Sequence, residues 1–424
     1  MLTSTTAFNR PLANGLVMKS IVNMQDVERL AAFNGHSFND GVAGMTSALI
    51  LHHAATRPEH WLYVEDEASG QIVSSLCLIP WAWRIEDVPL KVGEMGIVST
   101  LETYRNRGII RALAARHHEI MREEGFDLGA IQGIPYFYRQ FGYEYAVPLE
   151  AHWHMQLHSI PDSWKDDDKA HSFRAATVED IPQLTALYQE ATNGLHISTV
   201  RSADHWQYLL QHNGGTETEG EIGLLLDAEA QPIGYWGMAH HGFGDGLIVN
   251  ETSRLSLAAD KALFQWLKAA AIQQNKPYIR LNLPPHNDLV QLAKYAGAQN
   301  NGTYAWQIHL VDVARLLMKL KPLFERRIAA SPFSGLTRKV LINLYREAFE
   351  LTFDGGKLLT VRSMGFCDGG EIRIPPLVFA QLVLGYRSIE ELKAVYPDVS
   401  VWGEGQYLMD VLFPKLAAFI FPSY

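Results

Sequence analysis

Cysteine is scarce in this chain. Only Cys77 and Cys367 occur among 424 residues, which excludes a disulfide framework as the basis of its stability. Cys77 falls within an apolar pattern typical of a strand, so we predict a small buried side chain there. Because a chain without disulfides suits a reducing compartment, we expect a cytoplasmic protein.

Long apolar runs are also absent. No stretch of about 18 uninterrupted apolar residues occurs, so we expect no membrane-spanning helix. The first fifteen residues contain no apolar run typical of a signal peptide. Positive charge is in deficit, because 36 Lys and Arg stand against 46 Asp and Glu, a formal net charge of −10. Nucleic-acid binding requires a basic surface, so we expect neither nucleic acid nor membrane as a partner, and the negative balance favours a cationic one.

The composition is that of a globular protein. Hydrophobic residues make up 47% of the chain and charged residues 19%. The length suggests roughly two to four domains. Residues 146–159 alternate between apolar and polar and predict an edge strand. The polar segment 159–172, which contains three consecutive aspartates, predicts a linker.

The order of predicted elements repeats along the chain. Residues 16–38 predict a strand and a helix, with Asn23 as the N-cap. Residues 61–85 predict two strands joined by a turn at Ala68-Ser69-Gly70. Segments of the same kind recur in the same order at 173–192 and 220–241. We therefore predict two consecutive halves built on one plan.

A basic turn joins the strand predicted at 93–100 to the helix predicted from residue 109. It reads Arg105-Asn106-Arg107-Gly108-Ile109-Ile110. A helix N-terminus offers unpaired N–H groups and a positive dipole to phosphates, and glycine lets the backbone approach them closely. The corresponding segment of the second half, 249–257, has no glycine and no paired arginines. We therefore expect a phosphate site in the first half alone.

An aromatic segment follows at the next predicted strand. Residues 137–143 read Phe-Tyr-Arg-Gln-Phe-Gly-Tyr. The turn and this segment resemble, in order and spacing, the R/Q-x-x-G-x-G/A turn and FYxxxGF box of the GNAT acetyltransferase superfamily. Ile110 stands where that family has a small residue. The resemblance implies an acyltransferase that takes acetyl-CoA as its co-substrate.

The last part of the chain has its own pattern. Residues 311–331 predict an amphipathic helix interrupted at Pro322. Ser388 and Glu391 have the spacing of a capping box. The final fourteen residues, 411–424, are unusually apolar for a terminus, so we predict that they are buried.

The layout of the whole chain resembles the Eis-type (enhanced intracellular survival) acetyltransferases, which carry a stretch similar to IPPLVFAQLVLGYRSIEEL at 374–392. The resemblance implies an α/β (α+β) fold with two tandem GNAT-like mixed-sheet domains, followed by a sterol-carrier-like α+β domain. The expected boundaries are 1–157 for the catalytic domain, 158–308 for a degenerate copy and 309–424 for the C-terminal domain. A homo-oligomer is implied as well.

The resemblance also implies a set of cofactor-binding residues. They lie at the end of the strand, in the basic turn and after the next strand, and they are Val98, Ser99, Thr100, Arg105, Asn106, Arg107, Gly108, Ile109, Ile110, Gly133 and Ile134.

Two tyrosines are the expected catalytic residues. Tyr138 occupies the position of the family's general acid, and a phenol can protonate a leaving thiolate. Its rivals are Tyr136 and Tyr143, which would otherwise be packed aromatics. In Eis-type enzymes the C-terminal carboxylate accepts the proton of the amine, and here that carboxylate belongs to Tyr424. The alternative for Tyr424 is a tail docked for stability alone.

The acceptor pocket is less defined by the sequence. Phe33, His36, Trp81, Trp83 and Glu94 fall on elements that would line it, and Glu94 could meet a cationic amine. The histidines lack the partners of a metal site, so no metal is expected. We expect acetyl transfer to a primary amine of a small cationic acceptor, aminoglycoside-like or polyamine-like. The alternatives are a protein lysine or N-terminus as acceptor, or a non-catalytic protein that binds a lipid or apolar ligand in its C-terminal domain.

Overall fold

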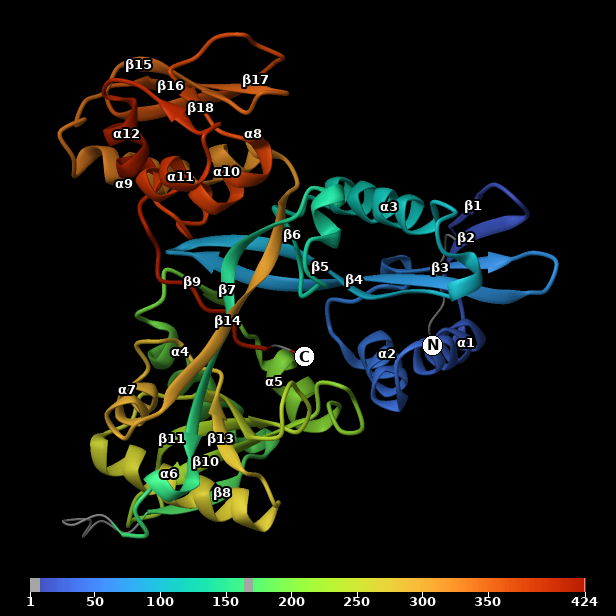
Figure 1. The fold of residues 1–424 in the computed structure, drawn as a ribbon, viewed down its shortest axis with the longest axis vertical. Helices are drawn as coiled ribbons and strands as arrows, with labels where there is room; N and C mark the ends of the chain where they lie inside the picture. The colour runs from blue at the N-terminus through green and yellow to red at the C-terminus, as the bar shows by residue number, and fades with distance from the viewer. Residues whose placement is uncertain (1–7, 164–170, 423) are drawn as a thin grey trace.

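The computed structural model describes residues 8–163, 171–422 and 424, apart from the side chain of residue 150. A large mixed sheet runs through the first two thirds of the chain, and a smaller sheet with its own helices forms the C-terminal part (Figure 1). This architecture confirms the predicted α/β class. The aspartate run predicted as a linker lies outside the described residues.

The first half begins with the predicted strand and helix, and Asn23 caps the helix by accepting a hydrogen bond from the Asp26 N–H at 3.0 Å. Its elements are β1 (Asn9–Pro11), β2 (Leu16–Ser20), α1 (Met24–Ser37), α2 (Asp40–His52), β3 (Trp61–Asp66), β4 (Gln71–Ile85), β5 (Val88–Thr100), α3 (Ile109–Glu123), β6 (Leu128–Ile131), the short 3₁₀ helix η3 (Phe137–Phe141) and β7 (Glu144–Gln156). Cys77 is buried in β4, as predicted.

The second half follows the same order of elements. They are β8 (Ser172–Ala175), α4 (Ile181–Thr192), β9 (Ile197–Thr199), α5 (Ala203–Gln211), β10 (Gly220–Leu226), β11 (Pro232–Ala239), β12 (Leu247–Thr252), α6 (Leu257–Gln273), β13 (Tyr278–Leu281), α7 (Asp288–Tyr295) and β14 (Gln299–Leu310). Strand, helices, hairpin, strand, helix and strand therefore recur from one half to the other.

The two halves exchange their last strands. The large sheet runs β5–β6–β14–β7–β13–β12, so β14 lies between β6 and β7 and pairs with both (Figure 1). β7 in turn pairs with β13 of the second half. The prediction of an edge strand at 146–159 is therefore wrong. Alternating residues mark an antiparallel strand with one covered face, but they do not tell an outer strand from an inner one.

The C-terminal part packs helices against a five-stranded sheet. Its elements are α8 (Val313–Lys319), α9 (Lys321–Ala329), β15 (Arg338–Asn343), β16 (Ala348–Asp354), β17 (Lys357–Gly365), β18 (Ile372–Arg373), α10 (Pro376–Val383), α11 (Ile389–Val395), β19 (Ser400–Val401) and α12 (Gly405–Leu412). The predicted helix breaks at Leu320, just before Pro322, and the capping box of Ser388 and Glu391 forms as predicted.

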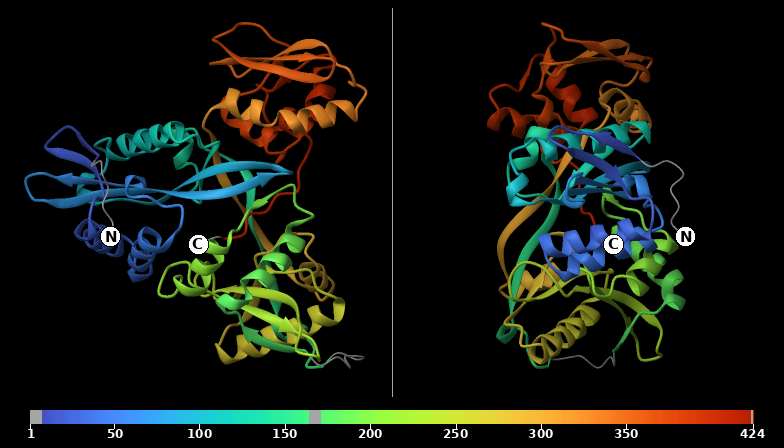
Figure 2. Two further views of the ribbon diagram at one scale, coloured as in Figure 1. Left: turned by 180° about the vertical axis from the view of Figure 1, so that it is seen from behind. Right: turned by 90° about the vertical axis from the view of Figure 1, so that its right-hand side faces the viewer.

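The last residues leave the C-terminal part and run back to the large sheet. Figure 2 shows this tail ending between the two halves. Phe419, Ile420, Phe421 and Tyr424 are all buried, which confirms the predicted burial of the terminus. Among the helices of the described ranges, none is long and apolar enough to cross a bilayer.

Candidate active site

A cavity opens where β5 and β6 separate. These parallel strands pair only from Val92 and Leu128 to Glu94 and Ala130. Beyond that point β5 continues to Thr100 while the chain after β6 turns away. The cavity at this end of the strands measures about 710 Å³, and its walls are the end of β5, the basic turn, the start of α3 and η3. The early end of the strand pairing thus creates the space.

Most of the expected cofactor-binding residues line this cavity. They are Val98, Ser99, Thr100, Arg105, Asn106, Gly108, Ile109, Ile110 and Ile134. The sequence therefore located one contiguous site, although these residues come from a strand end, a turn and a loop.

Two residues of the expected set lie elsewhere. The Arg107 guanidinium donates to the Thr103 carbonyl at 2.8 Å and lies over the Tyr104 ring, 4.8 Å from its centroid. Gly133 lies behind the Tyr138 ring, where an added Cβ would come within 2.2 Å of a ring carbon. In this structure Arg107 shapes the turn, and Gly133 makes room for Tyr138.

The sequence missed other residues of the cavity wall. Ser37 and Phe38 reach it from the C-terminal end of α1, and Arg111 reaches it from the first turn of α3. Arg111 extends the basic turn by one position and could have been included on that ground. Ser37 and Phe38 carry no local signal, because only the packing of α1 brings them to the site.

Gly108 is the N-cap of α3 and has a φ of 77°, in the left-handed region that favours glycine. A Cβ there would meet no atom within 4 Å, so the backbone alone opposes a side chain. We expect Gly108→Ala to destabilise the protein by about 1 kcal/mol and to raise KM for acetyl-CoA several-fold, because the new methyl group faces the expected phosphates. Thermal unfolding and steady-state kinetics check this.

Gly70 offers a matched control. It lies in the hairpin turn after β3 with a φ of 68°, and its Cβ would also meet no atom within 4 Å. Gly70→Ala should cost similar stability and leave KM for acetyl-CoA unchanged. An equal rise of KM in both variants would refute the assignment of Gly108 to the phosphates.

Tyr138 lies on η3 and faces the same cavity. It is 6% exposed, and burial raises the pKa of its hydroxyl to about 12. The hydroxyl is therefore protonated at neutral pH and can donate a proton. Its rivals differ, because Tyr136 is 74% exposed, while Tyr143 is fully buried and its hydroxyl has no hydrogen-bond partner among the described residues.

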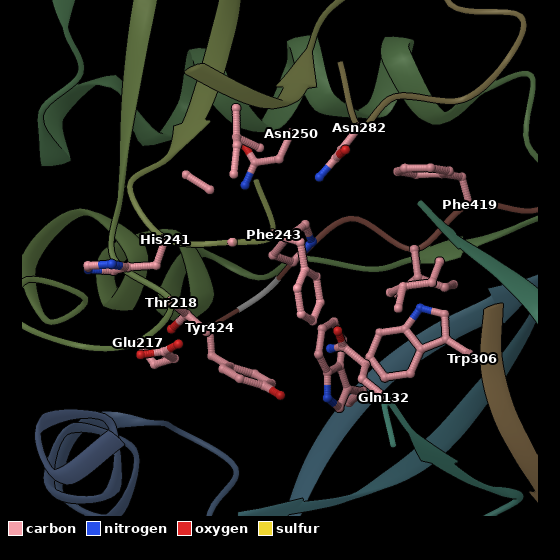
Figure 3. Close-up of a pocket in the computed structure, with 17 residues that line it drawn as sticks. Gln132, Glu217, Thr218, His241, Phe243, Asn250, Asn282, Trp306, Phe419 and Tyr424 are labelled. Atoms are coloured by element: carbon pink, nitrogen blue, oxygen red, sulfur yellow. The ribbon is translucent and has the colours of Figure 1, made fainter. Parts of the chain in front are cut away.

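A second cavity, of about 240 Å³, lies where the two halves and the tail meet. Trp81 and Gln132 come from the first half, Glu217 and Asn250 from the second, and Tyr424 from the tail. Figure 3 shows these walls, with the Tyr424 ring directed to the side where Gln132 lies. Gln132 lines this cavity and Ile134 lines the first, so the two cavities flank one short segment.

Glu94 lies at the last pair of the β5–β6 ladder, beside this second cavity. One of its carboxylate oxygens accepts hydrogen bonds from the Trp81 indole N–H at 2.8 Å and from the Tyr424 hydroxyl at 2.5 Å. Gln132 also hydrogen-bonds this carboxylate. Burial raises the pKa of Glu94 to about 7 despite these three donors, because the side chain is removed from water. A carboxyl with this pKa can exchange a proton at neutral pH.

The tail that delivers Tyr424 is clamped to the second half. The buried Arg201 donates to a Glu251 carboxylate oxygen at 2.8 Å and also to the Pro422 carbonyl. The Thr199 hydroxyl donates to the Phe421 carbonyl at 2.8 Å. These bonds fix the tail on one half while its last side chain reaches Glu94 on the other.

The remaining expected acceptor residues divide into two groups. Trp81 lines the second cavity, and Glu94 lies directly behind that wall. Trp83 is buried against Trp81 and Trp306. Phe33 and His36 lie on α1. None of Trp83, Phe33 and His36 lines either of the two cavities. No local pattern marks Gln132 or Glu217, because both lie in loops that only the fold brings together.

Comparison with protein families found a match within the first half of the chain. Residues 23–146 match the family described as "Acetyltransferase (GNAT) domain". No curated protein matches the chain.

Three solved structures are similar over nearly the whole chain. A probable N-acyltransferase from Enterococcus faecalis V583 has a TM-score of 0.71 at 15% identity and covers 99% of this chain and 100% of its own. A GCN5-related N-acetyltransferase from Anabaena variabilis has a TM-score of 0.69 at 15% identity, covering 96% and 99%. Eis1 from Mycobacterium abscessus has a TM-score of 0.64 at 16% identity, covering 96% and 100%. At these identities the likeness concerns the fold.

The family match covers the strands, the basic turn and the aromatic segment that enclose the 710 Å³ cavity. Residues 23–146 are similar to GNAT acetyltransferase domains, and the chain is an acyltransferase that uses acetyl-CoA as its co-substrate.

Proposed function

We propose that this protein is an N-acetyltransferase that moves the acetyl group of acetyl-CoA to a primary amine of a small cationic acceptor. The observation that carries the proposal is the position of the two cavities. The larger, basic one and the smaller, aromatic one lie on either side of residues 132–134. A donor in one and an acceptor in the other would meet at the separation of β5 and β6.

The larger cavity fits the donor. Arg105 and Arg111 bring positive charge to its wall, and the N-terminus of α3 adds unpaired backbone N–H groups. When bound, acetyl-CoA supplies an acetyl group activated as a thioester. The protein orients that group and handles the protons.

Two protons have to move in the transfer. The amine nitrogen forms a bond to the acetyl carbon, the carbon–sulfur bond breaks, and the sulfur leaves with a pair of electrons. Tyr138 donates a proton to that sulfur, since its raised pKa keeps the hydroxyl protonated. A carboxylate takes the proton that the amine gives up.

Two carboxylates are candidates for that second role. The α-carboxylate of Tyr424 is the one that the Eis-type resemblance implies, and its reference pKa of about 3.3–3.7 makes it a weak base. Glu94 has a pKa of about 7 and lies at the separation of the strands. We favour Glu94 as the proton acceptor and propose that the Tyr424 side chain holds it in position.

The acceptor cavity favours a small molecule over a protein. Its volume is about 240 Å³, and the tail and both halves wall it. A peptide strand would need a continuous groove beside a sheet edge. The strands next to this site are paired on both sides, since β6 lies between β5 and β14.

We further propose the division at 1–157, 158–308 and 309–424, with the second part a degenerate copy. The segment that leads into α6, residues 249–257, supports this, because it has neither the glycine nor the paired arginines of the basic turn in the first half. We also propose that the third part is sterol-carrier-like, that the protein forms a homo-oligomer and that it is cytoplasmic.

Thiol release from acetyl-CoA in the presence of primary amines tests the function. We expect release that depends on the amine and an N-acetylated product by mass spectrometry. The same amine already N-acetylated is the matched control and should give no release. Acetyl-CoA binding without turnover of any amine would refute the N-acetyltransferase assignment.

A further inference from the structure

The acceptor cavity is small for a transferase of large molecules. Ligand pockets that hold drug-sized molecules measure roughly 300–1,000 Å³. The cavity beside Glu94 measures about 240 Å³. The part of the acceptor that this cavity encloses is therefore smaller than a drug-sized molecule.

Aromatic rings form much of its wall. Trp81 lies edge-on to both Tyr424 and Trp306, with ring centroids 5.1 and 5.7 Å apart. Phe243 and Phe419 complete the set (Figure 3). Such rings bind a flat apolar body by stacking and attract a nearby ammonium group through their faces.

Phe243 stands out among these rings. It lies in the loop between β11 and β12, is flanked by Gly242 and Gly244, and is 80% exposed. An exposed aromatic ring at a cavity wall gains burial when an apolar ligand covers it. Phe243 is thus available to a ligand without any part of the core being displaced.

The charges of the cavity are few. Among the described residues that line it, Glu217 carries a side-chain carboxylate and Tyr424 carries the terminal carboxylate of the chain, and no lysine or arginine is present. Glu94 adds a third carboxyl behind the wall. A ligand whose ammonium groups outnumber these carboxyls would bury charges without partners, which is costly. A ligand with one ammonium group and an aromatic body matches both the carboxyls and the rings.

We propose, on the basis of the function above, that the acceptor is a compact arylalkylamine with one primary amine on a short chain and one aromatic ring. Its amine lies toward Gln132 and Glu94, and its ring packs among Trp306, Phe419 and Phe243. This narrows the expected range of acceptors and sets aside the aminoglycoside-like and polyamine-like ones.

A comparison of three amines tests the proposal in the full-length protein. We expect kcat/KM for 2-phenylethylamine to exceed that for spermidine and for kanamycin A by at least tenfold in the thiol-release assay. A higher kcat/KM for either polycation would overturn the proposal while leaving the N-acetyltransferase function intact. If neither these three amines nor any other primary amine supported thiol release, the proposed function itself would be refuted.

A variant locates the ring of the acceptor. Phe243→Ala should raise KM for 2-phenylethylamine about tenfold or more and leave kcat nearly unchanged, because it removes binding that is equal in the ground and transition states. Phe366→Ala is the matched control, since Phe366 is also exposed, at 71%, but lies in the C-terminal part. An unchanged KM in Phe243→Ala would contradict the placement of the ring.

Discussion

Tyr138→Phe is expected to lower kcat by about 10²-fold or more while KM for acetyl-CoA changes little, because general acid catalysis of this kind contributes roughly 10²–10⁴-fold. The variant removes one hydroxyl and keeps the ring that packs against Gly133. Without that hydroxyl the sulfur must leave as an unprotonated thiolate. Steady-state thiol release and a separate measurement of acetyl-CoA binding check this.

Tyr143→Phe is the matched control. Tyr143 lies five residues along the chain and is fully buried, and its hydroxyl has no hydrogen-bond partner in the part of the chain that the structure describes. Loss of that hydroxyl should leave kcat unchanged. If Tyr138→Phe retained full activity and Tyr143→Phe lost it, the proton donor would be Tyr143.

Glu94→Gln is expected to lower kcat/KM for the amine by about 10²-fold at pH 8. Burial holds the pKa of Glu94 at about 7, so the wild type should gain activity as pH rises through 7 and the carboxyl loses its proton. The variant should lose that inflection. A pH profile of kcat/KM between pH 5.5 and 9 measures both effects.

Four titratable groups near Glu94 have pKa values shifted out of that range. Burial raises the pKa of the Cys77 thiol and of the Tyr424 hydroxyl well above their ordinary values. Burial lowers the pKa of His117 to about 3 and that of His53, which lies beside Tyr424, also to about 3. An inflection near pH 7 can therefore be assigned to Glu94 among these residues.

Extension of the chain by one glycine beyond Tyr424 separates the two candidate bases. It moves the terminal carboxylate and keeps the tyrosine side chain that binds Glu94. If Glu94 is the base, the extended chain should keep its pH inflection near 7. Loss of activity in the extended chain, with Glu94→Gln still active, would assign the role to the Tyr424 carboxylate.

Stability gives a second readout for Glu94. Its pKa in the folded protein, about 7, lies above the ordinary value of 4.5, so the folded state binds more protons between those values. Stability should therefore fall as pH rises from about 4.5 to 7, at a cost of about 3 kcal/mol once the carboxyl is charged. Glu94→Gln removes this cost, so it should unfold at a higher temperature than the wild type at pH 8.

Local signals determined several features around the larger cavity and elsewhere in the chain. Gly108 is the N-cap of α3 with a positive φ, Asn23 caps α1, and the chain breaks beside Pro322, each as the residue type predicts. Such features depend on a few neighbouring residues, and so the sequence alone specifies them. Of the eleven cofactor-binding residues that the family resemblance implied, nine line the larger cavity.

The acceptor site depends on contacts between distant residues. The alternation of apolar and polar residues in β7 did not predict that β14 pairs beside it, because edge strands and inner strands can both show this alternation. Glu94 and Tyr424 are 330 positions apart, and the raised pKa of Glu94 comes from burial that no local pattern expresses.

The sequence by itself determined the fold class, the repeated order of elements and the glycine-capped basic turn, because short-range backbone and side-chain preferences encode them. Only the tertiary structure decided the exchange of strands, the clamp of Arg201 on the tail and the aromatic cavity beside Glu94. Those features arise when segments far apart in the chain become neighbours, and burial then changes what their side chains can do.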